Sequence, residues 1–279
     1  LLQSLVGSED YIEEILIGDN NEDSRLFGDK VLTMLPRSIR DIITTFPFGN
    51  NLGVCDARDV LLKNSKAGIL LFLDDDIVFD NFRDSAKHLF KIFSSDRAEA
   101  VAFKIISSKT SKVNPLEFPH WDKNLIGQEY FYTYYFVGAA FAIDLDYIRR
   151  VGINGFPKLP SKYGMEEIGL AWYIINSGGR ILYDSALSIV HLNSPSGRFN
   201  SDLQLYMICM NRLFLVNSHL SLKYKFTNRL AWAMLYFKNT FNIPQSLFLL
   251  FYRRKALKSI KFNRTFYKKI DEVGGRIRY

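Results

Sequence analysis

The stretch that most constrains this fold is ILLFLDDD at residues 69–76, an apolar run that ends in three adjacent aspartates. A short apolar run bounded by polar residues predicts a buried strand, and a strand buried on both faces needs helices on both sides of its sheet. Because side chains alternate along a strand, Asp74 and Asp76 are expected to point one way and Asp75 the other.

Two carboxylates about 4 Å apart repel by about 4 kcal/mol at an effective dielectric of about 20. A fold tolerates this repulsion best when a cation lies between or beside the carboxylates. Hard oxygen ligands suit Mg²⁺ or Mn²⁺, so the triplet predicts a divalent metal site that also holds substrate phosphates. A solvated turn rich in aspartate is the alternative that this stretch alone leaves open.

The segments around the triplet alternate between strand and helix patterns. Residues 13–21 predict a strand, 50–68 a loop and a helix stopped by glycine, 81–95 a second helix and 98–106 a third strand. This alternation predicts an α/β fold with a mostly parallel central sheet flanked by helices. Ligands of such sheets bind beyond the carboxyl ends of the strands, where both Asp19 and the triplet are expected.

The second half of the chain continues this pattern more loosely. Residues 107–132 predict a long loop and 134–152 a strand followed by a short helix. Residues 162–180 predict a helix stopped by two glycines. Residues 181–194 predict a pair of strands that ends at His191, a side chain that could complete a metal shell.

Charge is spread unevenly along the chain. The net charge is +7, yet residues 197–279 contain 16 basic and only three acidic residues. Within this region, residues 247–269 mix apolar and basic residues and predict a basic amphipathic helix that lies on an anionic membrane surface. A homo-oligomer interface is the second interpretation. Nucleic acid is not an expected partner, because no nucleic-acid-binding motif is present.

Two further observations predict the cellular compartment of the protein. The apolar stretch 230–252 is interrupted by polar residues, so it is not expected to span a bilayer. The two cysteines, Cys55 and Cys209, are too few for a disulfide framework and favour a reducing compartment. We therefore expect a cytoplasmic protein, peripheral on the inner face of the plasma membrane.

A series of motifs, taken in their order along the chain, resembles the family 2 glycosyltransferases of the GT-A fold. The resemblance covers about residues 1–215 and rests on Asp19-Asn20-Asn21, Asn51, Gly53, Ala57-Arg58-Asp59, Ala67-Gly68, the aspartate triplet, YFVGAAFAI at 135–143, YGMEEIGLAWYI at 163–174 and SIVH at 188–191. The chain departs from the family pattern at Asp59, Gly169 and Tyr173, where the family usually has Asn, Asp and Arg.

The resemblance implies an inverting, metal-dependent hexosyltransferase acting in bacterial-type polysaccharide or glycolipid assembly. The donor would be a nucleotide-sugar, with UDP- or dTDP-sugars expected, and the acceptor a hydroxyl of a glycan or lipid-linked sugar. Asp76 would be the main ligand of Mn²⁺ or Mg²⁺, with Asp74 and His191. The donor-binding residues implied are Asp19, Asn20, Asn51, Arg58, Asp74, Asp75, Gly138 and Ala139.

By the same resemblance, Glu167 would take the proton from the acceptor hydroxyl, with Glu166 as its support. Acidic residues in the first turn of a helix are also favoured by the helix dipole alone, which is the structural alternative for this pair. His120 and Trp121, in the predicted loop, could form a wall of the acceptor site, although ordinary loop packing explains them as well.

Three regions are expected from these assignments. Residues 1–106 would form the nucleotide-sugar-binding half, with a first strand expected before Leu1. Residues 107–195 would form the acceptor-binding half, and 196–279 a helical basic region that associates with the membrane.

Two other functions remain open from the sequence. The stretch FLDDDIV also fits a phosphohydrolase of the haloacid dehalogenase type, with Asp74 as nucleophile and Asp76 as acid and base, but the later residues of that family are not found in a convincing set. A non-catalytic, membrane-attached scaffold with a degenerate transferase fold is the second alternative, which the departures at Gly169 and Tyr173 leave open.

Overall fold

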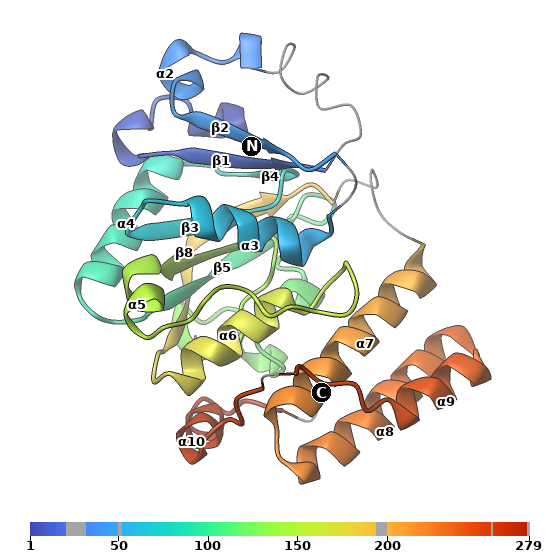
Figure 1. Ribbon diagram of the computed structural model, residues 1–279. Helices are drawn as coiled ribbons and strands as arrows, with labels where there is room; N and C mark the ends of the chain where they lie inside the picture. Colours follow the sequence, from blue (N-terminus) through green and yellow to red (C-terminus); the bar gives the residue numbers. More distant parts are fainter. Residues whose placement is uncertain (21–31, 50–51, 194–199, 258, 278–279) are drawn as a thin grey trace.

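The computed structural model describes residues 1–20, 32–49, 52–193, 200–257 and 259–277 (Figure 1). Its strands are β1 Ile15–Asp19, β2 Ile43–Pro47, β3 Ile69–Leu73, β4 Ile77–Val78, β5 Ala100–Ser107, β6 Tyr130–Thr133, β7 Ala140–Asp144 and β8 Ile181–His191. Its α-helices are α2 Arg37–Arg40, α3 Val54–Asn64, α4 Phe82–Ser94, α5 Leu145–Arg150, α6 Glu166–Asn176, α7 Ser201–His219, α8 Leu222–Thr240, α9 Ile243–Phe251 and α10 Arg264–Glu272.

The strands form two sheets. Five strands run in the order β3-β7-β5-β8-β4, β6 adds to β8, and β1 pairs with β2 separately. The β1–β2 and β5–β8 ladders are parallel, whereas β3–β7, β5–β7, β4–β8 and β6–β8 are antiparallel. The predicted α/β class is confirmed. The strand predicted before Leu1 stays a prediction.

Apolar residues cover both faces of the central sheet, as its apolar strand patterns predict. On β5, Val101 and Phe103 belong to one buried cluster, which includes residues of α4. The alternate residues Ala100 and Ala102 belong to a second buried cluster, which includes residues of α6 and α10. This alternation follows from the two-residue period of a strand and makes β5 a two-sided core strand.

Three local predictions are corrected by the structure. Residues 181–191 form one strand instead of a pair, with a register shift against β5 between Phe103 and Lys104. Residues 247–269 are not one helix, because α9 ends at Phe251 and α10 begins only at Arg264. The segment 107–132, predicted as loop, contains the start of β6 and two short 3₁₀ turns, of which Pro115–Glu117 matters for the site.

Helices α7, α8 and α9, called here the helical arm, lie beside the sheet domain in Figure 1 and share their own buried cluster. Helix α10 follows and packs on α6, with the Trp172 and Phe266 rings 5.9 Å apart. In the described part of the chain, every helix is too short or too polar to cross a bilayer.

Candidate active site

The aspartate triplet lies at the carboxyl end of β3, beside the start of β7. The Asp74 amide donates to the Ala139 carbonyl at 3.0 Å, which fixes the triplet at this edge of the sheet. Asp75 is exposed. Asp74, Asp76 and His191 each offer one ligand atom, and these atoms all lie within 4.8 Å of one another. Carboxylate oxygens with an imidazole nitrogen are a donor set that fits Mn²⁺, and the group could therefore hold a metal ion.

His191 enters this group because β4 pairs with the end of β8. Its Nε2 lies 3.1 Å from Asp76 Oδ1, and its Nδ1 lies 2.6 Å from Glu117 Oε1. The other oxygen of Glu117 accepts a hydrogen bond from the Asn114 side-chain amide at 2.7 Å. When Nδ1 donates its proton to Glu117, the lone pair of Nε2 faces the aspartates, as a metal ligand requires.

Sequence reasoning missed Glu117. It lies in the 3₁₀ turn Pro115–Glu117, and Asn114 caps this turn by accepting from the Leu116 amide. Such a pattern in a sequence indicates a local turn and nothing more. The pairing of Glu117 with a histidine 74 positions later depends on the tertiary fold, so the sequence contains no signal for it.

Arg58, on α3, connects the triplet with the glutamate pair. Its guanidinium donates to Asp74 at 2.7 Å, to Glu166 at 2.8 Å and to the Gly138 carbonyl at 2.7 Å. The residue is only 7% exposed, so it lies behind Asp74. Burial raises the pKa of Asp74 and the charge of Asp76 adds to this, while Arg58 opposes it. The planar fork of arginine suits this three-way contact better than a lysine would.

Small residues beside Arg58 give it room. A Cβ atom at Gly138 would lie 3.0 Å from Arg58 Nη1, which is tighter than ordinary packing. Ala139 is buried and accepts from the Asp74 amide. The observed reason for small side chains here is therefore the close approach of Arg58, whereas a role beside a donor sugar stays a prediction.

The glutamate pair begins α6 directly after a strained residue. Met165 has φ 75°, in the left-handed region that favours glycine. Glu166 is buried against Arg58, whereas Glu167 is half-buried and can meet a substrate. The two carboxyl groups are neighbours in the sequence, and the charge of Glu166 acts on the ionisation of Glu167.

Burial sets the protonation of this pair. Burial raises the pKa of Glu167 to about 8, and the neighbouring charge of Glu166 contributes further. Burial also raises the pKa of Glu166, where the positive charge of Arg58 opposes it. Glu167 is therefore mostly protonated at neutral pH, and it is the member of the pair closer to solvent. A carboxylate with a raised pKa can accept a proton from a hydroxyl group.

The predicted nucleotide residues lie at the end of β1. Asp19 is buried there, and Asn20 Oδ1 accepts from the Leu52 amide at 3.1 Å. Asn51 lies outside the described residues. Gly53, in the same loop before α3, has φ 87°, and a Cβ atom there would lie 2.8 Å from Lys162. The hydrogen bond from Leu52 to Asn20 thus links the end of β1 to the start of α3, the helix that supplies Arg58.

The departures from the family pattern have local structural reasons. Asp59 is buried and accepts from the Lys63 ammonium at 2.8 Å and from the Phe156 amide at 3.1 Å. At Gly169, a Cβ atom would lie 2.4 Å from Pro157 Cγ, so no larger residue fits. The Tyr173 hydroxyl lies 3.2 Å from the Nε2 atom of a buried histidine on α7. None of the three positions therefore indicates a lost site.

The loop residues expected to line an acceptor site are placed differently. His120 is 2% exposed, and its Nε2 lies 3.1 Å from the Val273 carbonyl. The Trp121 indole donates to the Gly274 carbonyl at 2.6 Å, and Arg276 stacks 3.2 Å from its ring centroid. Both side chains hold the segment after α10 through its backbone carbonyls, and His120 is buried there. His120 as an acceptor wall is therefore wrong.

Comparison with known proteins places this fold. No protein-family model matches the chain. An uncharacterized protein of Haemophilus influenzae is 30% identical over 131 residues, which make up 47% of this chain and 70% of that protein. Such an identity over most of the relative indicates common descent, although it assigns no activity.

Solved structures extend the comparison to nearly the whole chain. The crystal structure of GalNAc-T7 with UDP, GalNAc and Mn²⁺ matches 97% of this chain with a TM-score of 0.64 and 16% identity; this chain spans 53% of its length. The structure of Staphylococcus aureus TarS 1–349 with UDP-GlcNAc matches 90% with a TM-score of 0.59 and 14% identity, over 74% of that chain. The Pyrobaculum calidifontis mannosyltransferase PcManGT, in complex with GDP-Man and Mn²⁺, matches 88% with a TM-score of 0.56 and 14% identity, over 68% of that chain.

These matches confirm the GT-A fold expected from the motifs. They extend over most of the chain, so the phosphohydrolase alternative has no support from the fold.

Proposed function

The chain belongs to the same family as the uncharacterized Haemophilus influenzae protein and has the fold of the three glycosyltransferase structures, and we propose that it is itself a metal-dependent glycosyltransferase. The donor is a nucleoside-diphosphate sugar, and the acceptor is a hydroxyl group. One observation carries this proposal: the metal-binding group Asp74, Asp76 and His191 is joined through Arg58 to a glutamate pair that can take a proton.

Asp76, Asp74 and His191 would hold the divalent ion, Mn²⁺ or Mg²⁺. When bound, such an ion supplies positive charge for the diphosphate as it leaves. The orientation of His191 by Glu117 and of Asp74 by Arg58 keeps these ligands in place before the donor arrives. The donor-binding residues beyond this group are Asp19 and Asn20 at the end of β1, Asn51, and Gly138 with Ala139.

Glu167 acts as the general base. Its carboxylate accepts the proton of the acceptor hydroxyl, while the oxygen of that hydroxyl forms a bond to the anomeric carbon of the donor sugar. The bond between the anomeric carbon and the diphosphate oxygen breaks, and the nucleoside diphosphate leaves with the bonding electron pair. Attack from the face opposite the leaving group inverts the anomeric configuration. Glu166, its neighbour in the first turn of α6, is held by Arg58.

The finer assignments concern donor and acceptor. UDP or dTDP is proposed as the nucleotide, which agrees with UDP in two of the three related structures and differs from GDP in the third. The acceptor is proposed to be a growing glycan or a lipid-linked sugar in polysaccharide or glycolipid assembly. An enzyme with such an acceptor works at the inner membrane surface, and the basic charge of residues 197–279 supports this location.

The test is release of nucleoside diphosphate from a panel of UDP-, dTDP- and GDP-sugars with Mn²⁺. We expect release from at least one donor, loss of release in Asp76→Asn and Glu167→Gln, and normal release in the control Asp80→Asn, which removes an exposed acid just after β4. Normal release in Asp76→Asn, or no nucleotide binding by the wild-type protein, would contradict the proposal. The second result would favour a non-catalytic scaffold.

A further inference from the structure

The C-terminal helices have a positive charge that no acidic residue of the same segment balances. From Leu203 to Ile270 the chain contains 13 lysines and arginines and neither aspartate nor glutamate. The cations also crowd one another: burial and the nearby Arg253 both lower the pKa of Arg229. Burial lowers the pKa of Lys261 to about 8, and Lys225 and Lys255 add to the effect. Such a concentration of positive charge attracts an anionic surface.

The same helices expose two apolar stripes. On α8, apolar residues spaced three or four apart share one face and are exposed: Leu222, Phe226, Leu230, Met234, Phe237 and Phe241. On α9, the exposed residues Ile243, Leu247 and Phe251 repeat at a spacing of four. Phe226 is 70% and Phe241 76% exposed.

The two helices pack against each other, so the stripes belong to one helical pair (Figure 1). Exposed apolar patches of this extent are rare on soluble monomers and mark surfaces that meet a partner or a membrane.

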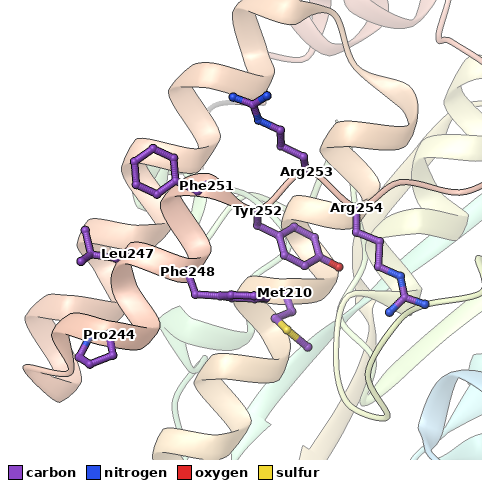
Figure 2. A pocket seen from close by; sticks show the side chains of 8 residues that line it. All are labelled: Met210, Pro244, Leu247, Phe248, Phe251, Tyr252, Arg253 and Arg254. Atoms are coloured by element: carbon purple, nitrogen blue, oxygen red, sulfur yellow. The ribbon is translucent and has the colours of Figure 1, made fainter.

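A groove opens between α9 and α7 beside these stripes. It has a volume of about 750 Å³, and Figure 2 shows Leu247, Phe248 and Phe251 of α9 along it with Met210 of α7. Tyr252, which also lines the groove, is 6% exposed, and its hydroxyl has no hydrogen-bond partner among the described residues. That hydroxyl is itself buried, so the groove offers a ligand mainly apolar side chains.

Two arginines follow Tyr252 at the end of α9. Arg253 and Arg254 are exposed, line the groove and extend to different sides of Tyr252 (Figure 2). Their backbone is fixed, because the Asn217 side-chain amide donates to the carbonyls of Tyr252 and Arg254. The groove thus combines an apolar body with a cationic end, which matches an acyl chain on an anionic surface.

We propose that the α8–α9 face lies on an anionic bilayer, that the α7–α9 groove takes an acyl chain of an anionic lipid, and that Arg253 and Arg254, on different sides of Tyr252, bind phosphates of that surface. This deepens the membrane location given under the proposed function and names the surface and the ligand. A second copy of the chain is the weaker occupant, because a symmetric dimer through this face would bring cation against cation. A nucleic-acid strand would satisfy the charge but leave the aliphatic part of the stripes uncovered.

The first experiment measures flotation of the full chain with vesicles of phosphatidylcholine, alone or mixed with phosphatidylglycerol. No donor and no metal are added, so failure here is separate from failure of the proposed enzyme activity. We expect binding to the mixed vesicles. The variant Arg253→Gln/Arg254→Gln should bind them about thirtyfold more weakly, at roughly fivefold for each basic residue removed. Leu247→Ser/Phe251→Ser should weaken binding by at least roughly tenfold.

The matched control is Phe90→Ser/Lys91→Gln, which removes an exposed aromatic and an exposed basic residue from α4, a helix of the sheet domain. It should bind like the wild type. No binding of the wild type to mixed vesicles would overturn the proposal, and so would equal loss in the control. A dimer in solution whose α8–α9 face is protected without lipid would also overturn it.

The second experiment tests the groove itself. A tryptophan placed by Phe248→Trp should be quenched by phosphatidylglycerol that carries a nitroxide on its acyl chain, whereas Phe90→Trp on α4 should not be quenched. Each is compared with the parent chain, so that the three native tryptophans cancel. Vesicle binding with no additional quenching at position 248 would show that the groove takes no acyl chain.

Discussion

The candidate active site and the helical arm differ in how their charged side chains are balanced. At the site the central polar groups are paired within the chain: Arg58 lies between Asp74 and Glu166, and His191 lies between Asp76 and Glu117. In the arm and the segment after it, cations crowd one another, and after Asp202 in the first turn of α7 no acid follows until Asp271. The first region is preorganised from within the chain, whereas the second depends on negative charge from outside.

The largest effect is expected when Glu167, the proposed general base of the site, is replaced. Glu167→Gln keeps the shape of the side chain but removes its ability to accept a proton. General-base catalysis contributes roughly 10²–10⁴-fold, so sugar transfer should slow by about that factor. Because the amide leaves the metal group untouched, the affinity for nucleoside diphosphate in the presence of Mn²⁺ should stay near the wild-type value. Steady-state kinetics and calorimetry measure the two quantities separately.

Arg58 tests whether the site is stabilised from within. Arg58→Met leaves Asp74 and Glu166 without their shared cation, and breaking a buried pair in this way costs about 3–5 kcal/mol in the free energy of unfolding. Urea denaturation measures it. The control Arg37→Met breaks an exposed pair with Asp41 and should leave the midpoint unchanged. Equal stability of the Arg58 variant would mean that the cation is dispensable to the fold.

Glu117 tests the orientation of His191. Partners of metal ligands typically contribute 10–100-fold to metal affinity, so Glu117→Gln should weaken Mn²⁺ binding by about that factor. Titration of the protein with Mn²⁺, followed by the signal of the free ion in electron paramagnetic resonance, measures it without any turnover. Leu116→Gln, an exposed change in the same turn, is the matched control. If both variants bind the metal equally well, Glu117 does not position His191.

The raised pKa of Glu167 predicts a rate that depends on pH. A base must be unprotonated, and the pKa of Glu167 is about 8. Transfer under conditions of low substrate should therefore rise about tenfold per pH unit below this value and become level above it. A rate that is already constant from pH 6 upward would place the base elsewhere.

The smallest effect is expected in the arm. Phe226→Ser removes an apolar side chain that is mostly exposed, so the free energy of unfolding should change by no more than about 0.5 kcal/mol. If Phe226→Ser loses vesicle binding while its stability is unchanged, the apolar stripe of α8 serves membrane binding and does not stabilise the fold. A large loss of stability would instead mean that Phe226 is covered in the native protein.

The site was predictable where it depends on strand ends. Asp74, Asp76 and His191 each follow or end an apolar strand pattern, and strands of one sheet bring such ends to a common edge. The base could be proposed from the motif around Glu167. Glu117 and the central contacts of Arg58 could not be predicted, because they join residues far apart in the sequence through the tertiary fold.

The break in the predicted helix at 247–269 has a similar cause. Amphipathic spacing continues through the segment, but buried side chains of α7 bind residues 252–256, which form no helix. Asn217 donates to two carbonyls there, and the Ser218 hydroxyl accepts from the Ala256 amide at 2.8 Å. Tertiary hydrogen bonds of this kind override local helix preference, and periodicity alone does not reveal them.

The most direct test of the central claim is calorimetric titration of UDP, dTDP and GDP into the protein with Mn²⁺ and with a chelator, for the wild type and for Asp76→Asn. We predict that at least one nucleotide binds the wild type only when Mn²⁺ is present, and that the variant, while still folded, loses this binding. Nucleotide binding that is the same with chelator, or unchanged in Asp76→Asn, would contradict a metal held by Asp74, Asp76 and His191.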